Sequence, residues 1–239
     1  DGGSAAGSLE GWEKCDIREP WRVLESHRWY RTVVRIPEEL DGCHVEFLVT
    51  TGREGQWDAT NPQMLFYLNG KIIQGVDVNH REICISREAK AGEEYEIALL
   101  AFSGSVPGDL ILHTELVTVD ERVEKVYYDF LVPVKAARLL KKPDPENHRR
   151  ILERMGPAAD VLDLRQPYSG RFYDSLEKAG EILRKEFYSH VRKEGPTVSG
   201  VGHTHIDIAW LWTVEQTREK VLRSFSTVLE LMERYPDYR

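Results

Sequence analysis

The hydrophobic pattern of this chain changes its period once, at Asp120. Before this residue, apolar and polar side chains alternate in short runs separated by clusters of Pro, Gly, Asn and Asp, which is typical of half-buried β-strands. After it, apolar residues recur about every 3.6 positions, which is typical of amphipathic helices. The runs that we expect to form strands are 29–36, 44–50, 64–68, 82–85, 95–101 and 110–118. The sequence therefore predicts a β domain over residues 29–119 and a helical region after it.

A two-residue turn is predicted at Asn69-Gly70, between the apolar runs 65–68 and 71–73. A type I′ turn needs positive φ at both central residues, which asparagine and glycine tolerate. Several short strands with turns at this spacing favour an antiparallel β-sandwich. Periodicity alone does not separate a jelly-roll order of strands from an immunoglobulin-like order, so the topology stays open at this point.

The helical region, residues 120–196, is predicted to connect the β domain to whatever begins at Thr197. Proline and glycine mark its interruptions, because proline removes a backbone donor and glycine favours helix ends. We expect helices over residues 123–140, 146–155 and from Ser169 or Asp174 to about Arg192. Pro133 is expected to mark a break or kink, and Gly156-Pro157 and Gly195-Pro196 are expected to be stops.

The composition excludes several classes of protein. Hydrophobic residues make up 41% and charged residues 30% of the chain, which is typical of a globular protein rather than a disordered or membrane one. The net charge of -8 argues against a nucleic-acid partner. No apolar stretch approaches the roughly 20 residues that a membrane-spanning helix needs, so no membrane partner is expected.

The cysteines indicate a reducing compartment, and we expect a cytoplasmic protein. Residues 1–28 form a lead-in whose start lacks a methionine, a basic region and an apolar region, so it does not resemble a signal peptide. The three cysteines, Cys15, Cys43 and Cys84, are odd in number and contain no CxxC pair. A disulfide framework is thus excluded, and buried free thiols are expected.

A motif with metal-ligand chemistry lies in the segment 198–212. A short apolar strand is expected here, and in an extended chain His203, His205 and Asp207 share one face. Imidazole and carboxylate groups are ligands that zinc prefers, and Trp210 follows directly. A helix is expected next, because Thr213 and Gln216 form a capping box. Its apolar face is predicted to comprise Val214, Val221, Phe225, Val228 and Met232.

The pattern alone leaves several interpretations open. A hydrogen-bonded polar corner next to the helix is the structural alternative, with Asp207 near the positive end of the helix dipole. Metallo-β-lactamase-like hydrolases continue His-x-His-x-Asp with another histidine, whereas Ile208 follows here. Amidohydrolase barrels use His-x-His at the end of the first strand, so a metal-dependent amidohydrolase stays a hypothesis.

Longer stretches resemble one family specifically. The segments 202–212, 215–220 and 224–238 are similar to the start of the catalytic domain of family 38 glycoside hydrolases, the zinc-dependent retaining α-mannosidases of the cytosolic or bacterial type. The segments 68–80 and 126–131 resemble the β-sandwich and the helical connector of that subgroup. The resemblance covers nearly the whole chain from Trp29 onward.

The fold class that we predict from pattern and resemblance together has three parts. They are an antiparallel β-sandwich of the jelly-roll, galactose-binding-like type (29–119), a helical connector (120–196) and the first β-α unit of an incomplete catalytic α/β barrel (197–239).

The resemblance also implies roles for individual residues. His205 and Asp207 match zinc ligands, His203 matches a histidine that supports the site without binding the metal, and Trp210 matches the tryptophan that packs against the mannose. A flat aromatic ring complements the apolar face of a sugar. The implied cofactor is one zinc ion, the implied partner is a mannose-containing oligosaccharide, and the complete enzyme is expected to be a homo-oligomer.

The family's nucleophile, its acid/base residue and two further zinc ligands have no match in this chain, so we predict no catalytic residue within it. Catalytic zinc sites usually use three protein ligands. We therefore expect this chain alone to be inactive and to bind zinc weakly. An alternative function is a stand-alone β-sandwich that serves as a carbohydrate-binding or oligomerisation module. The group Asp77, Asn79 and His80 is expected to order a turn or to form a small polar site.

Overall fold

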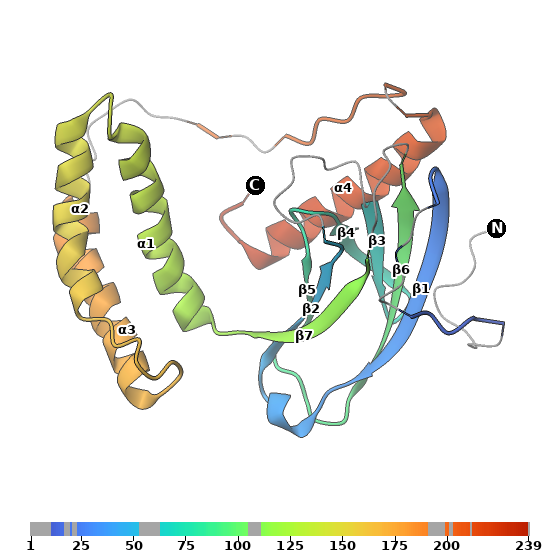
Figure 1. Ribbon diagram of the computed structural model, residues 1–239, viewed down its shortest axis with the longest axis horizontal. Helices are drawn as coiled ribbons and strands as arrows, with labels where there is room; N and C mark the ends of the chain where they lie inside the picture. Colours follow the sequence, from blue (N-terminus) through green and yellow to red (C-terminus); the bar gives the residue numbers. More distant parts are fainter. Residues whose placement is uncertain are drawn as a thin grey trace. The chain divides into compact units, whose positions relative to one another are not determined.

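The computed structural model describes residues 11–16, 20, 23–52, 63–104, 111–190, 199–200, 203–210 and 212–238. The chain divides into two compact units (Figure 1). One contains residues 1–119 together with 200–239, and the other contains residues 120–199. The C-terminal segment therefore belongs to the same unit as the β domain, although the helical region separates the two in sequence.

Seven strands form two antiparallel sheets in the described part of the first unit (Figure 1). The first sheet has the order β1-β6-β3-β4 and the second has the order β5-β2-β7. The strands are β1 (Ser26–Arg35), β2 (His44–Thr50), β3 (Gln63–Leu68), β4 (Lys71–Val76), β5 (Glu82–Ser86), β6 (Glu94–Ser103) and β7 (His113–Val119), with a short 3-10 helix at Glu38–Leu40. Each predicted run corresponds to one of these strands, so the prediction of antiparallel sheets is confirmed.

The turn between β3 and β4 forms as its sequence predicts. Asn69 has φ +49° and Gly70 has φ +77°, the two positive values that a type I′ turn requires. The side chain of Asn69 is used as well, because its Oδ1 accepts a hydrogen bond from the backbone N–H of Glu96 at 2.9 Å. This contact connects the hairpin to β6, the strand that pairs with β3.

The two sheets share one hydrophobic core. Phe47 of β2 and Phe66 of β3 lie with ring centroids 5.8 Å apart, which joins one sheet to the other. The buried members of this core come from both sheets and comprise Phe47, Val49, Met64, Phe66, Val76, Ile83, Ile85, Ile97, Leu99 and Ala101. Burial of these side chains on the inner faces is what holds an antiparallel sandwich together.

The second unit consists of three packed helices, α1 (Glu121–Leu140), α2 (Pro145–Asp160) and α3 (Gly170–Ile182). A π-helical turn (Leu183–Phe187) and a 3-10 turn (Tyr188–His190) extend α3, and the rest of the expected helix lies outside the described residues. Side-chain caps begin two of the helices. Asp120 accepts from the N–H groups of Arg122 and Val123, and Ser169, one of the two predicted helix starts, accepts from Phe172.

Neither a break at Pro133 nor a stop at Gly156-Pro157 occurs in this unit. α1 runs through Pro133, and α2 continues past Gly156-Pro157 to Asp160. A proline removes only one helical hydrogen bond, and packing outweighs that loss here. Pro133 is itself buried, and Ala158, which follows Pro157, is fully buried in a core with α3. A kink at Pro133 stays a prediction.

The segment before the last helix differs from its prediction. Residues 203–207 form no strand, and residues 208–210 form a bend. A strand needs a neighbour that satisfies its backbone donors and acceptors, and none of the seven strands in the described part pairs with this segment. The strand half of the expected β-α unit is therefore absent from residues 203–207, whereas the helix, α4 (Val214–Arg234), is present with its Thr213–Gln216 capping box.

α4 packs against β4 and β3, and Figure 1 shows it lying across the sheet. The buried residues of α4 are Thr217 and Thr227, both polar. Most of the predicted apolar face points to solvent instead, with Val214, Phe225 and Met232 exposed. The hydrophobic pattern thus predicts the helix correctly but not the face that it packs against the β-sheet.

Two further expectations concern membranes and cysteines. In the part of the chain that the structure describes, no helix is long and apolar enough to cross a membrane. Cys15, Cys43 and Cys84 are free thiols, as expected. They are less buried than expected, because Cys15 is exposed and the other two are half-buried.

Candidate functional site

A pocket of about 400 Å³ lies where the C-terminal segment meets the β domain. His203, His205 and Asp207 line it together with Trp212 from the same segment. α4 contributes Lys220 and Arg223, and the sandwich contributes Gln63, Asp77 and His80. The volume falls in the range of pockets that bind small molecules, about 300–1,000 Å³. We take this pocket as the candidate functional site.

The predicted metal ligands lie together although their segment is not a strand. His205 Nε2 and Asp207 Oδ1 are 2.9 Å apart, within hydrogen-bonding distance. The ring of His203 lies 5.9 Å from that of His205, measured between centroids. All three side chains are exposed, whereas Thr204 and Ile206 between them are half-buried. The alternation expected from sequence therefore persists in the irregular segment.

His205 and Asp207 fit two positions of a zinc site. Ligand atoms about 2.0 Å from a tetrahedral zinc ion lie about 3.3 Å from one another. The 2.9 Å between His205 Nε2 and Asp207 Oδ1 is close to that spacing. Within the described ranges, no group of three or more His, Cys, Asp or Glu side chains is arranged to hold a metal ion. The described residues thus bring together two side chains of ligand chemistry but no complete set of metal ligands.

The two tryptophans after the motif have different surroundings. Trp210 is 66% exposed and is not part of the pocket wall, whereas Trp212 is. The two rings meet edge to face at 5.6 Å between centroids. Trp212 is held by α4, because its Nε1–H donates to Thr217 Oγ1 at 3.1 Å. The structure therefore places Trp212 at the pocket and leaves Trp210 as a neighbouring surface ring.

α4 gives the pocket a cationic wall. Lys220 Nζ donates to Gln63 Oε1 at 3.1 Å and lies 4.2 Å from the centre of the Trp212 ring. Arg223 donates to the same Gln63 oxygen and forms an ion pair with Glu219 at 3.6 Å. Burial, with the neighbouring charge of Arg223, lowers the pKa of Lys220 to about 8. A half-buried amine next to an aromatic ring and an amide oxygen can donate hydrogen bonds to hydroxyl or anionic groups.

Lys220 is expected to be the most readily acylated lysine near pH 8. In about half of the molecules Lys220 is then a neutral, nucleophilic amine, whereas an ordinary lysine with a pKa near 10.4 is almost fully protonated at this pH. Because the native pKa lies below the unfolded one, the charged amine disfavours the native state below pH about 8. The contribution of Lys220 to the free energy of unfolding therefore increases as the pH rises from about 8 to about 10.5, where the unfolded chain binds more protons than the native one.

Limiting acetylation followed by peptide mass spectrometry measures this reactivity. The unfolded chain is the control, since there Lys220 loses both its burial and its neighbour Arg223. A labelling rate at Lys220 that is the same in the native and unfolded chains would contradict the lowered pKa.

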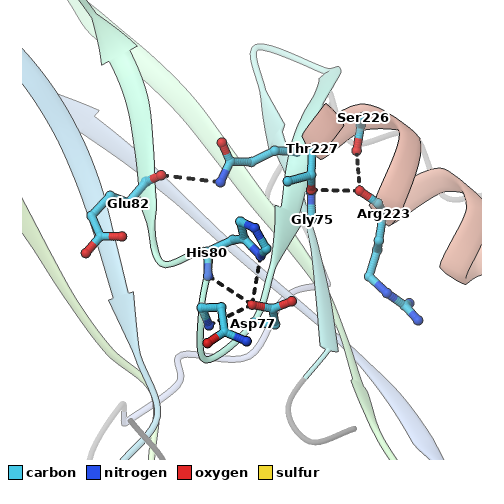
Figure 2. Close-up of polar contacts among 9 residues, drawn as sticks. Gly75, Asp77, His80, Glu82, Arg223, Ser226 and Thr227 are labelled. Atoms are coloured by element: carbon cyan, nitrogen blue, oxygen red, sulfur yellow. Dashed lines mark hydrogen bonds and ion pairs between the residues drawn. The ribbon is translucent and has the colours of Figure 1, made fainter. Parts of the chain in front are cut away.

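The sandwich brings a second histidine–aspartate pair to the pocket, in the loop after β4 (Figure 2). Asp77 Oδ1 accepts hydrogen bonds from the backbone of Asn79 at 2.7 Å and from His80 Nδ1 at 3.0 Å. Burial would raise the pKa of Asp77, but the hydrogen bonds and the charge of His80 lower it below its usual value. The bond to Asp77, opposed by burial, raises the pKa of His80. The expected turn-ordering role of Asp77 is therefore observed.

The same strand carries the contact that places α4 over the site (Figure 2). The backbone N–H of Gly75 donates to Thr227 Oγ1 at 3.0 Å, and that hydroxyl donates to Arg223 O at 2.8 Å. A Cβ on Gly75 would lie 2.9 Å from Arg223 Cβ and 3.0 Å from its carbonyl oxygen. Only glycine allows so close an approach of helix and strand. The site is thus built by the sandwich and α4 together.

The pocket's polar residues Gln63, Lys220 and Arg223 were not predicted as site residues from sequence. Lys220 and Arg223 resemble ordinary surface charges of an amphipathic helix, and Gln63 lies at the start of a strand. No local pattern marks them, because their contacts join positions more than 150 residues apart. The segment 75–80 did have a recognisable pattern, because its clustered Asp, Asn and His residues indicated a turn or a small polar site.

Comparison with known proteins gives the class first. Residues 195–239, which include the His-x-His-x-Asp segment and α4, match the model of the glycosyl hydrolases family 38 N-terminal domain. The family resemblance predicted from the motif is therefore confirmed, and this chain is related to family 38 glycosyl hydrolases.

Individual relatives then extend the relationship to most of the chain. "Alpha-mannosidase G" of Dictyostelium discoideum is 27% identical over 93% of this chain. The "Alpha-mannosidase" of Saccharomyces cerevisiae is 26% identical over 98% of it, and "Alpha-mannosidase 2C1" of Homo sapiens is 25% identical over 88%. The matched regions cover 21%, 23% and 20% of these relatives, so the chain spans about a fifth of their length.

Proposed function

We propose that this chain is part of a zinc-dependent retaining α-mannosidase that hydrolyses terminal α-mannosyl residues of glycans. The observation that carries the proposal is the contact between His205 and Asp207 at a pocket of about 400 Å³, within the segment that matches family 38. The similarity to three proteins named α-mannosidases supports the substrate class.

In this proposal His205 and Asp207 supply a nitrogen and an oxygen ligand to the zinc ion. The chemistry that zinc supplies when bound is Lewis acidity toward hydroxyl oxygens. His203, beside His205, keeps a supporting position, and Trp210 offers its exposed ring to the apolar face of the mannose. Lys220 and Arg223 present hydrogen-bond donors to sugar hydroxyls.

We further propose that the sandwich is of the jelly-roll, galactose-binding-like type, that residues 120–196 connect it to the catalytic part and that residues 197–239 begin an α/β barrel. The exposed apolar stripe of α4, which comprises Leu222, Phe225, Leu229 and Met232, is then the surface on which the barrel packs. Such a stripe is costly in water, which favours a covered state. The complete protein in this proposal is a cytoplasmic homo-oligomer.

The nucleophile, the acid/base residue and the remaining zinc ligands lie elsewhere in the complete protein under this proposal. We therefore expect this chain alone to hydrolyse no aryl α-mannoside and to bind zinc weakly, because two ligands fall short of the three that catalytic zinc sites usually have.

Two measurements test the proposed function. The complete protein should contain zinc, hydrolyse nitrophenyl α-mannoside, and lose both zinc and activity after His205→Ala or Asp207→Ala. Metal analysis and calorimetry give a readout that is independent of activity. A zinc-loaded complete protein without α-mannosidase activity would overturn the proposal. Tight stoichiometric zinc binding by the 239-residue chain would contradict the division of the site between this chain and other parts.

A further inference from the structure

The Asp77–His80 pair lies far from the metal motif in sequence but lines the same pocket as His205 and Asp207. It belongs to the β-sandwich, the part of the chain outside the matched family segment 195–239. The sandwich therefore contributes polar groups to the candidate site as well as supporting it.

The pair is held rigidly, as a ligand-binding group must be. Asp77 Oδ1 accepts from three donors: Asn79 N at 2.7 Å, His80 N at 2.9 Å and His80 Nδ1 at 3.0 Å. These bonds close the turn and fix the ring of His80, because Nδ1 is used internally. Within the described residues, His80 Nε2 and Asp77 Oδ2 form no hydrogen bond, and both residues line the pocket, so these two atoms are available to a ligand. The His80 side chain is 40% exposed, which permits such contact.

The position of the pair relative to the rest of the pocket is also fixed. Only Val76 separates Asp77 from Gly75, whose backbone N–H is bound to Thr227 of α4. Figure 2 shows Gly75, Asp77 and His80 following one another along the strand and its loop beside α4. Arg223 of α4 belongs to the same pocket wall and holds Gln63 of the sandwich.

The chemistry of the pair suits a polyhydroxylated ligand. A sugar hydroxyl is both donor and acceptor, and a carboxylate beside an imidazole offers an acceptor and a ring nitrogen that takes either role. Lys220 and Arg223 add donors only. A pocket with both kinds of group can distinguish the positions of neighbouring hydroxyls, since a buried polar group left without its partner is costly.

We propose that Asp77 and His80 form a specificity-determining contact of the mannoside site, in which they hydrogen-bond one hydroxyl group of the bound sugar. The inference rests on the proposed function, because it takes the α-mannoside as the ligand. It assigns part of substrate recognition to the β-sandwich, so that the sandwich is needed for selectivity.

The test uses the complete protein, nitrophenyl α-mannoside and each of its monodeoxy analogues. Asp77→Asn and His80→Gln should lower kcat/KM on the parent mannoside about 10- to 100-fold, the range expected for a hydrogen bond that involves a charged group. On the one analogue that lacks the contacted hydroxyl, the same substitutions should lower kcat/KM less than about threefold, because the hydrogen bond is already absent. The ratio between substrates is measured within each variant, so it is independent of the folded fraction.

Asn79→Ala is the matched control. Asn79 lies in the same turn, but its side chain is exposed and outside the pocket, and the bond to Asp77 comes from its backbone. This variant should keep the substrate ratios of the unmodified protein.

The outcomes separate this inference from the proposed function. If the unmodified protein hydrolyses no α-mannoside, both the proposed function and this inference are wrong. An active unmodified protein in which Asp77→Asn and His80→Gln leave all substrates unchanged, or lower all of them equally, overturns this inference alone.

Discussion

Gly75→Val is expected to destabilise the packing of α4 on the sandwich by about 3 kcal/mol, the sum of overpacking and the loss of a buried hydrogen bond. The new Cβ would lie 2.9 Å from Arg223 Cβ and 3.0 Å from a backbone oxygen, neither of which is a flexible side-chain end. Relief of this clash requires α4 to move away, which breaks the bond from Gly75 N to Thr227 Oγ1.

Hydrogen exchange of the α4 amides, together with urea unfolding of the 239-residue chain, measures this effect. Gly75→Ala should give a smaller change of the same sign. Gly156→Ala is the control, because a Cβ there meets no atom within 4 Å and alanine favours a helix interior. Unchanged protection of α4 in Gly75→Val would show that the close approach of helix and strand is not needed.

Arg234→Met is expected to cost roughly 3 kcal/mol of stability, the lower end of the range for breaking a buried ion pair. Arg234 Nη1 lies 2.9 Å from Glu46 Oε1, and the Glu46 side chain is only 3% exposed. Loss of the arginine removes this ion pair from a buried carboxylate, whose Oε1 also lies 3.6 Å from His44 Nε2.

Urea unfolding at neutral pH tests this expectation. The double variant Glu46→Gln/Arg234→Met should recover much of the loss, because it removes both charges. Arg149→Met is the matched control, since the Arg149–Glu153 pair is exposed on both sides and should contribute less than about 0.5 kcal/mol. Equal effects of Arg149→Met and Arg234→Met would contradict the assigned burial of the Glu46 charge.

The candidate site shows which part of such a structure is accessible from sequence. His205 and Asp207 could be predicted as a pair because they are two residues apart, and any extended or bent backbone keeps them close. The expected strand around them did not form in residues 203–207, because a strand depends on partners elsewhere in the chain. A pair of ligands is a local property, whereas a strand is not.

The face that α4 packs against the β-sheet could not be predicted from its hydrophobic pattern. The periodicity indicates the face with Phe225 and Met232, but the helix buries Thr217 and Thr227 and packs through Arg223. The sandwich presents a backbone donor at Gly75 and a buried carboxylate at Glu46. Thr227 of α4 accepts a hydrogen bond from the first, and Arg234 of α4 forms an ion pair with the second. The spacing of apolar residues along a helix contains no information on such partners.

The sequence by itself determined most of the strands and helices, one hairpin turn, one helix cap and the family motif, because each depends on residues close together in the chain. Asn69-Gly70 and Thr213 with Gln216 are examples. Only the tertiary structure decided that Asp77 and His80 share a pocket with His205 and Asp207. That meeting depends on a helix approaching a strand about 150 residues away at a position where only glycine leaves room, and a contact of this kind has no local signature.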